Sequence, residues 1–225
     1  MIRAVLLGLC LTLSVAGPAG AQTPPSAAEI AAYEGLHKAA HAGDVAEIER
    51  LARQNVDLEA RDGNGRTAVH VAAFAGKVDA IAALAAAGAD MNSLEGGRYD
   101  AVTIAAVAND VPTLDAALKA GNRPDNVTSV WDGNALIAAA HEGNHESIAR
   151  LIAAKSKLDH VNSLGWTAII ESIVLGDGGP RHQQSLKHLL DAGADKSIAD
   201  RAGNTPLDLA RERGYGEMVK LLGGG

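Results

Sequence analysis

The sequence predicts an all-α fold, a solenoid of about six helix-turn-helix units. Three observations predict it. A pattern recurs about every 33 residues, a period typical of stacked repeats. In each copy a glycine or asparagine follows a helix start at a fixed distance, and a second amphipathic segment comes after it. No unit of this kind can bury its apolar face alone, so stacked neighbours supply the core.

The first 21 residues differ from the repeats. A single arginine precedes the apolar run Ala4–Ala16, and Ala19-Gly20-Ala21 has the small-x-small form of a cleavage site. This arrangement predicts a secretory signal peptide, residues 1–21, cleaved after Ala21. A signal that stays in place as a membrane anchor is the alternative. Residues 22–29 are expected to form a flexible lead.

Residues 30–225 are expected to form one repeat array. Each unit opens at a residue suited to a helix N-cap, and nine positions later stands a residue suited to a helix end. The pairs are Glu34/Gly43, Thr67/Gly76, Asp100/Asn109, Asn134/Gly143, Thr167/Gly176 and Thr205/Gly214. The units lie near residues 30–61, 62–94, 95–128, 129–161, 162–199 and 200–225. The third has the weakest pattern, so we expect it to be the least regular.

Several segments carry a resemblance to a known family. They are Thr67–His70 with Ala72-Ala73 and Gly76, Ala87–Asp90, Ala192–Asp195 and Gly203–Leu207. On these segments the chain resembles the ankyrin-repeat family over about residues 30–222. The resemblance implies a curved ankyrin-repeat solenoid of helix pairs with β-turn fingers along one edge. It also implies that a protein partner binds a concave face, made of the finger tips and the exposed ends of the first helices.

The positions that form this face hold much of the aromatic content. Four of the six Phe, Tyr and Trp residues beyond the predicted signal lie there. Exposed aromatic residues in a strip are typical of binding hot spots. The alternative is that each tryptophan packs on a neighbouring turn. The predicted protein-binding residues are Arg66, Phe74, Tyr99, Val107, Trp131, His141, Trp166, Val174 and Leu175.

The stretch His141–His145 reads HEGNH and fits the zinc motif H-E-x-x-H. That motif needs both histidines on one face of a continuous helix. Here Gly143 is the closing glycine of the fourth unit, so the two histidines are expected to lie on different helices. A metal-dependent hydrolase using His141, Glu142 and His145 is the third-ranked function.

The fifth unit carries an insertion of about five residues between its two helices, by comparison with the second unit. Glycine and proline favour a loop there. We expect either a second contact site, on the edge opposite the fingers, or a neutral insertion. The surrounding segment, residues 166–182, resembles stretches of secreted bacterial ankyrin proteins. The residues of the insertion are Asp177, Gly178, Gly179, Pro180, Arg181 and His182.

Composition narrows the function classes. The formal net charge is −7 and no Lys/Arg cluster occurs, which disfavours binding to nucleic acid or to an anionic membrane. The only cysteine, Cys10, lies in the predicted signal, so the mature chain has no disulfide. Neither a nucleophile–base constellation nor a cofactor motif is present in the sequence, and we expect no cofactor, no metal and a monomer.

The sequence thus predicts a non-enzymatic protein-binding module of the bacterial periplasm. By resemblance, some exported bacterial ankyrin proteins are linked to the protection of periplasmic enzymes, including enzymes of oxidative stress. Protection or regulation of such an enzyme is therefore one expected role. An inhibitor or immunity protein that blocks a toxin or a hydrolase is the alternative within the same class.

Overall fold

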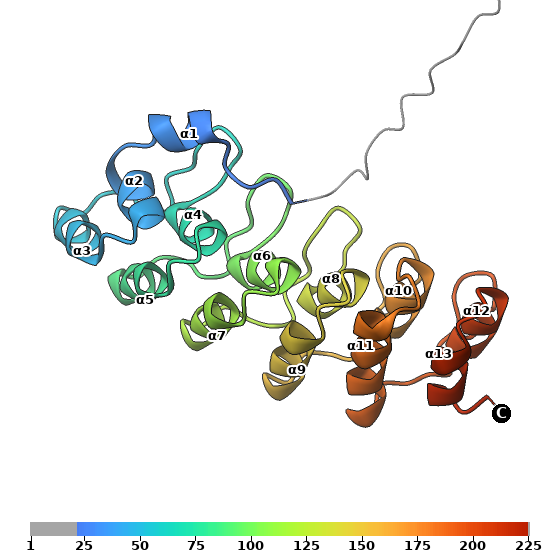
Figure 1. Cartoon of the computed structure of the whole chain (residues 1–225). Helices are drawn as coiled ribbons and strands as arrows, with labels where there is room; N and C mark the ends of the chain where they lie inside the picture. Colours follow the sequence, from blue (N-terminus) through green and yellow to red (C-terminus); the bar gives the residue numbers. More distant parts are fainter. Residues whose placement is uncertain (1–21, 225) are drawn as a thin grey trace, which may run out of the picture.

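The structure, a computed structural model, describes residues 22–224 (Figure 1). The predicted signal peptide and its cleavage site lie outside these residues. The helices are α1 Ala27–Ala32, α2 Gly35–Ala42, α3 Val45–Arg53, α4 Ala68–Phe74, α5 Val78–Ala87, α6 Ala101–Ala108, α7 Val111–Lys119, α8 Ala135–His141, α9 His145–Ala153, α10 Ala168–Val174, α11 Pro180–Asp191, α12 Pro206–Glu212 and α13 Gly216–Leu221. In residues 22–224 no helix is both long and apolar enough to cross a membrane.

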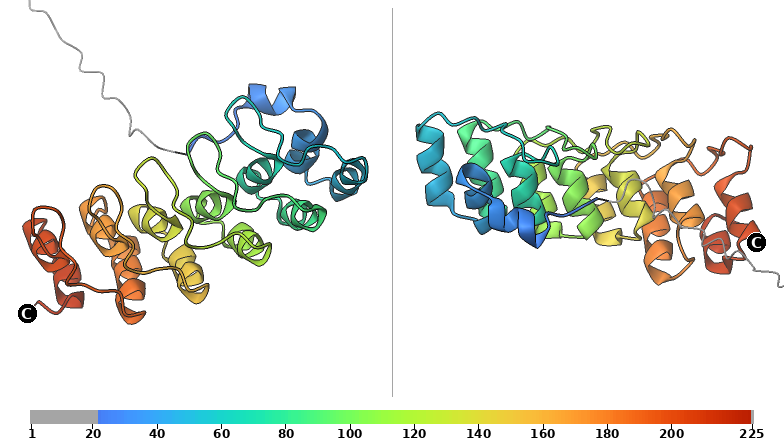
Figure 2. Two further views of the ribbon diagram at one scale, coloured as in Figure 1. Left: turned by 180° about the vertical axis from the view of Figure 1, so that it is seen from behind. Right: turned by 90° about the horizontal axis from the view of Figure 1, so that it is seen from above.

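From α2 onward the helices form six consecutive pairs, which confirms the predicted solenoid. The first helices of the pairs pack on one another in one row, from α2 to α12. The second helices, from α3 to α13, form a parallel row (Figure 1). The long loops that precede the first helices lie along one edge of the stack, as the right view of Figure 2 shows. These loops are the fingers.

One core runs through all six pairs. Each second helix contributes a side chain with no exposed surface: Ile48, Ile81, Leu114, Ile148, Leu186 and Met218. Full burial of one such side chain stabilises a fold by about 1.5–3 kcal/mol. The first helices carry alanines at their centres, such as Ala72 and Ala139, and these allow adjacent helices to approach closely.

Predicted opening and closing residues of the units lie at helix ends. Asn134 and Thr167 accept a backbone N–H from the first turn of α8 and α10, as N-caps do. Gly76 and Gly143 have φ of 63° and 66°, a conformation that a Cβ penalises. Asn109 ends α6 with φ of 52°, the role that glycine has in other units.

The third unit differs from our expectation, because its helices are regular. The buried Asp100 accepts bonds from Thr103 N and Oγ1 through Oδ1, at 2.8 and 2.7 Å. Its Oδ2 accepts from the amides of Asn122 and Asn126, both at 2.8 Å. This network replaces the one in the second unit, where His70 bonds Thr67. The irregular segment is instead the finger that follows the third unit.

Helix α1 lies at the end of the segment expected to be a flexible lead. Ser26 and Glu29 form a capping box at its start. The Glu29 carboxylate also accepts hydrogen bonds from Arg66 and Asn64 in the finger of the second unit. The lead is therefore tied to the array through this carboxylate.

Candidate functional site

Four fingers share one construction. The first side chain of each accepts the backbone N–H groups two and four residues later, through a carboxylate or an amide oxygen. These residues are Asp62, Glu95, Asn162 and Asp200. Each such bond closes the turn locally, so these four fingers are compact.

The finger of the fourth unit, which we call the fourth finger, is not one of these four and is built differently. Thr128 N–H donates to the Gly133 carbonyl at 2.7 Å, and the two residues form an antiparallel bridge. Ser129 and Asp132 adopt positive φ inside this loop. Three apolar residues of this loop are exposed: Val127, Val130 and Trp131, at 43%, 51% and 44%. This concentration of exposed large apolar groups occurs at no other finger in residues 22–224.

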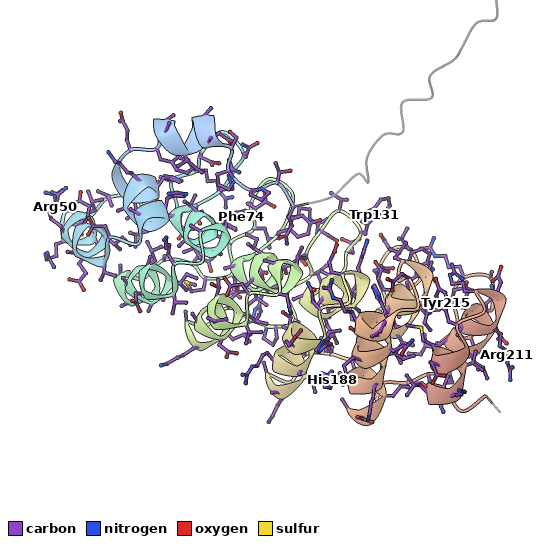
Figure 3. The ribbon with its side chains drawn as sticks, viewed as in Figure 1. Arg50, Phe74, Trp131, His188, Arg211 and Tyr215 are labelled. Carbon is purple, nitrogen blue, oxygen red and sulfur yellow. The ribbon has the colours of Figure 1, made fainter. Side chains whose placement is uncertain are left out.

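A pocket of about 180 Å³ lies beside this finger, between α6, α8 and α10. We call it the fourth-finger pocket. Its lining includes Thr128, Ser129 and Gly133 of the finger, the apolar side chains Ile137 and Ala138 of α8, and Glu171 of α10. Three consecutive units thus contribute to one cavity. Trp131 lies on the loop beside α8 (Figure 3).

The structure brings four of the nine predicted binding residues to this pocket. Tyr99, Val107, Trp131 and His141 line it. Tyr99 differs from the expectation of an exposed side chain, because it is buried, and burial raises the pKa of its hydroxyl. Phe74, Trp166 and Val174 lie outside the pocket and pack partly on the core, while Leu175 is exposed beyond α10.

Arg66 is not available to a partner, contrary to the prediction. Its side chain has no exposed surface and forms ion pairs with Glu29 and Asp62. The Nε–Oδ2 distance to Asp62 is 2.7 Å, and Nη1 donates to the Thr23 carbonyl at 3.1 Å. The spacing of the repeats places Arg66 in a finger, but helix α1 covers it. Arg66 therefore has a structural role.

The charges of the pocket come from α8 and α10. Glu171 is buried, and its Oε1 lies 3.6 Å from His141 Nδ1. The Glu171 carboxylate raises the pKa of His141, burial of the ring opposes this, and the charge of Glu142 adds to it. Glu171 Oε2 is buried without a hydrogen-bond partner, which is costly for a carboxylate oxygen.

Reasoning from the sequence missed Glu171, together with Ile137, Ala138 and Asn162. The signal for Glu171 was present, because it is the only charged residue in the segment Ala168–Val174. The signal for Ala138 was weaker. It stands four positions after the opening residue of its unit, as Glu171 does in the next unit, and its small side chain leaves room in front of that carboxylate.

The HEGNH stretch does not form one helix. Helix α8 ends at His141, α9 begins at His145, and Gly143 adopts φ of 66° between them. The two histidines have separate partners: His141 faces Glu171, and the ring of His145 stacks on His188 at 6.0 Å. Within residues 22–224 no group of three or more metal-ligating side chains is gathered.

The insertion is part helix, where a loop was expected. Helix α11 begins at Pro180, so Arg181 and His182 lie in its first turn. Arg181 donates to Asn144 of the fourth unit at 2.5 Å. His182 lies 3.0 Å from the His141 carbonyl and 2.9 Å from the Asp177 carboxylate.

The sixth unit also contacts the insertion, through Tyr215. The Tyr215 hydroxyl donates to the Gly176 carbonyl at 3.0 Å, and the Tyr215 ring lies against Gly178. The insertion thus connects the fourth, fifth and sixth units. Arg181 and His182 bond to the fourth unit, while the Asp177 and Arg181 side chains remain largely exposed.

Comparisons with known proteins agree with this architecture. A family model described as ankyrin repeats in three copies matches residues 4–95 and 102–200. A curated relative, the ankyrin repeat protein YahD of Escherichia coli (strain K12), is 38% identical over 102 residues. That match covers 44% of this chain and 51% of the relative, so the chain spans about half the length of the curated relative it matches.

Solved structures match over most of the chain. An ankyrin repeat domain from Acinetobacter baumannii AYE is 40% identical with a TM-score of 0.77, covering 83% of this chain and 95% of that chain. A second match is a structure described as a predatory endopeptidase from Bdellovibrio bacteriovorus in complex with an immunity protein. It is 26% identical with a TM-score of 0.69, covering 84% of this chain and 97% of that chain.

Proposed function

The chain belongs to the ankyrin-repeat family, and from that premise we propose that it is a non-enzymatic protein-binding module of the bacterial periplasm. Ankyrin repeats generally mediate contacts between proteins. The partner is a folded protein, held at the fourth-finger pocket and the finger above it. Binding protects or regulates that partner, for example a periplasmic enzyme of oxidative stress.

The exposed Trp131 beside a preformed pocket carries this proposal. Trp131 is 44% exposed, and Val127 and Val130 on the same finger are exposed as well. Large apolar groups in one contiguous patch mark interaction sites on protein surfaces. Tryptophan is also enriched among the residues that dominate binding energies. The other tryptophan, Trp166, packs partly on the core and serves the fold.

Affinity capture from a periplasmic extract tests the proposal. The bait is the chain from residue 22 onward, next to Trp131→Ala and a control variant, Leu221→Ala. Leu221 is also a large exposed apolar residue, but it lies in α13, away from the pocket. We expect one partner to be retained by the wild type and the control, and lost with Trp131→Ala. Equal capture by all three would refute the site.

A second candidate function is an inhibitor or immunity protein. The similarity to a structure of an endopeptidase in complex with an immunity protein favours it. The two functions differ in the effect on the partner. A captured hydrolase whose activity falls on binding supports inhibition, and a captured enzyme whose activity is retained or prolonged under stress supports protection.

A further inference from the structure

We propose that the fourth-finger pocket receives an arginine side chain of the bound partner, with its guanidinium held by Glu171 and Glu142 against the Trp131 ring. The inference rests on the proposed function, since it names the chemical group by which the partner is recognised. Three features of the pocket support it: an unsatisfied buried carboxylate oxygen, the size of the cavity, and the sign of its charges.

One oxygen of the buried Glu171 carboxylate lacks a hydrogen-bond donor. The residue is 6% exposed and lines the pocket, and its Oε2 has no hydrogen-bond partner. A buried carboxylate oxygen without a donor is costly, and a cation bound beside the carboxylate offsets part of that cost. His141 does not meet the need, because its Nδ1 faces the other oxygen at 3.6 Å, beyond hydrogen-bond distance.

The dimensions favour a side chain over a free small molecule. Sites for drug-sized ligands typically have volumes of about 300–1,000 Å³. The fourth-finger pocket, at about 180 Å³, is smaller than that. Its lining includes the half-exposed Trp131, so we expect a side chain that projects from a docked surface to enter beside this ring.

The charges favour a cation. Glu142 and Glu171 both line the pocket, and its lining within residues 22–224 includes no lysine or arginine. The Arg98 side chain on the neighbouring finger is paired with Asp132 at 3.2 Å. An incoming cation therefore meets two glutamates, and the basic side chain in the lining is a histidine, His141, rather than a lysine or an arginine.

Arginine fits this lining better than lysine. A guanidinium is planar and weakly hydrated, it binds a carboxylate through two parallel N–H groups, and it stacks on aromatic faces. The pocket lining includes the buried carboxylate of Glu171 and the half-exposed indole of Trp131. Cation–π contact with tryptophan is the strongest of its kind among the aromatic side chains.

The test uses small probes in place of the partner. ¹⁵N-labelled protein is titrated with N-acetyl-arginine amide, N-acetyl-lysine amide and N-acetyl-citrulline amide. Citrulline has the shape of arginine without its charge. The readout is the indole N–H resonance of Trp131, assigned with Trp131→Phe. A ligand of this size is expected to bind in about the millimolar range. We expect a saturable shift with the arginine probe, a weaker one with lysine and none with citrulline.

Variants locate the site. Glu171→Gln keeps the shape and removes the charge, and should weaken binding of the arginine probe about tenfold or more. Glu212→Gln is the control, because Glu212 is an exposed glutamate at the end of α12. Thermal unfolding confirms that each variant is folded. Equal shifts with arginine and citrulline, or no saturable shift in folded protein, would overturn the inference.

Capture separates this inference from the proposed function. If Glu171→Gln retains the partner as well as the wild type does and Trp131→Ala loses it, the binding site stands and the arginine inference is wrong. If neither substitution affects capture, the proposed site itself is wrong. Loss with both substitutions and retention with Glu212→Gln support the two together.

Discussion

At the scale of a single residue, Arg66 joins the first helix to the repeat array. Its guanidinium donates to Glu29 before the array, to Asp62 in the same finger, and to the Thr23 carbonyl. The Tyr33 hydroxyl donates to the same Asp62 carboxylate at 2.9 Å. A fully buried cation is tolerated here because every side of it has an acceptor.

Replacing Arg66 should therefore destabilise the N-terminal part of the chain. Arg66→Met leaves Asp62 buried without its cation, and breaking a buried ion pair from one side costs about 3–5 kcal/mol. Urea unfolding followed by circular dichroism measures the change. The matched control is Arg50→Met, since Arg50 pairs with Glu47 on an exposed helix surface and should matter little. Similar losses in the two variants would contradict the assigned role.

The same cluster predicts a dependence on pH. Burial raises the pKa of Asp62, but the hydrogen bonds from Arg66, Tyr33 and Asn64 outweigh it and lower the pKa to about 2. A carboxyl with a depressed pKa in the folded state stabilises it above the unfolded pKa of about 3.9, and this contribution is lost as the pH falls through about 2. The difference between the folded and unfolded pKa corresponds to about 2.6 kcal/mol.

Asp62→Asn isolates this contribution. The difference in free energy of unfolding between wild type and variant should be nearly constant from pH 7 to pH 5 and should shrink between pH 4 and pH 2. Urea titrations at a series of pH values measure it. A difference that does not change with pH over this interval would mean that the Asp62 carboxylate is not selectively stabilised in its charged form.

At the scale of the element, the insertion of the fifth unit acts as a connector between repeats. His182 links the first turn of α11 to the end of α8, and Tyr215 links α13 to the backbone before the insertion. Adjacent units in a repeat protein contact only their neighbours, so such links set how strongly the units unfold together. Glycine is needed at position 178, where φ is 70° and the Tyr215 ring lies close by.

His182→Ala should loosen this connection. The variant loses two hydrogen bonds, each contributing about 0.5–1.5 kcal/mol, and we expect the free energy of unfolding to fall by about 1–3 kcal/mol. The substitution should accelerate amide hydrogen exchange more in α10–α13 than in α4–α7. His188→Ala is the control on the same helix, because His188 does not contact the insertion. Equal effects of both substitutions would show that the insertion is not a connector.

The helices themselves were predictable, and the reason is local. Thr167 at an N-cap and Gly143 at a helix end act through bonds and dihedrals of their own segment, so the repeat spacing located them. The burial of Arg66 and Tyr99 was not predictable in this way, because it depends on which element of another unit covers each side chain. For Glu171 the sequence marked the one charged residue of its helix, but not its place in the pocket, because its neighbours there come from the fourth unit.

At the scale of the whole molecule, the candidate site depends on the stacking of units. Val107 comes from the third unit, Trp131 and His141 from the fourth, and Glu171 from the fifth. The pocket exists only while these three units keep their register. The sequence predicted a strip of candidate binding positions, but not that an irregular fourth finger would concentrate the exposed apolar surface at one place.

Site-specific photo-crosslinking tests the central claim, that a protein partner binds over the fourth finger, most directly. Benzoylphenylalanine is introduced at Val127, which lies on that finger and leaves Trp131 intact, and in a second protein at Val78, at the start of α5 in the other helix row. Both positions are exposed, at 43% and 37%. After irradiation in periplasmic extract, we expect one adduct from position 127 and none from position 78. An adduct from position 78 alone would contradict binding of the partner over the fourth finger.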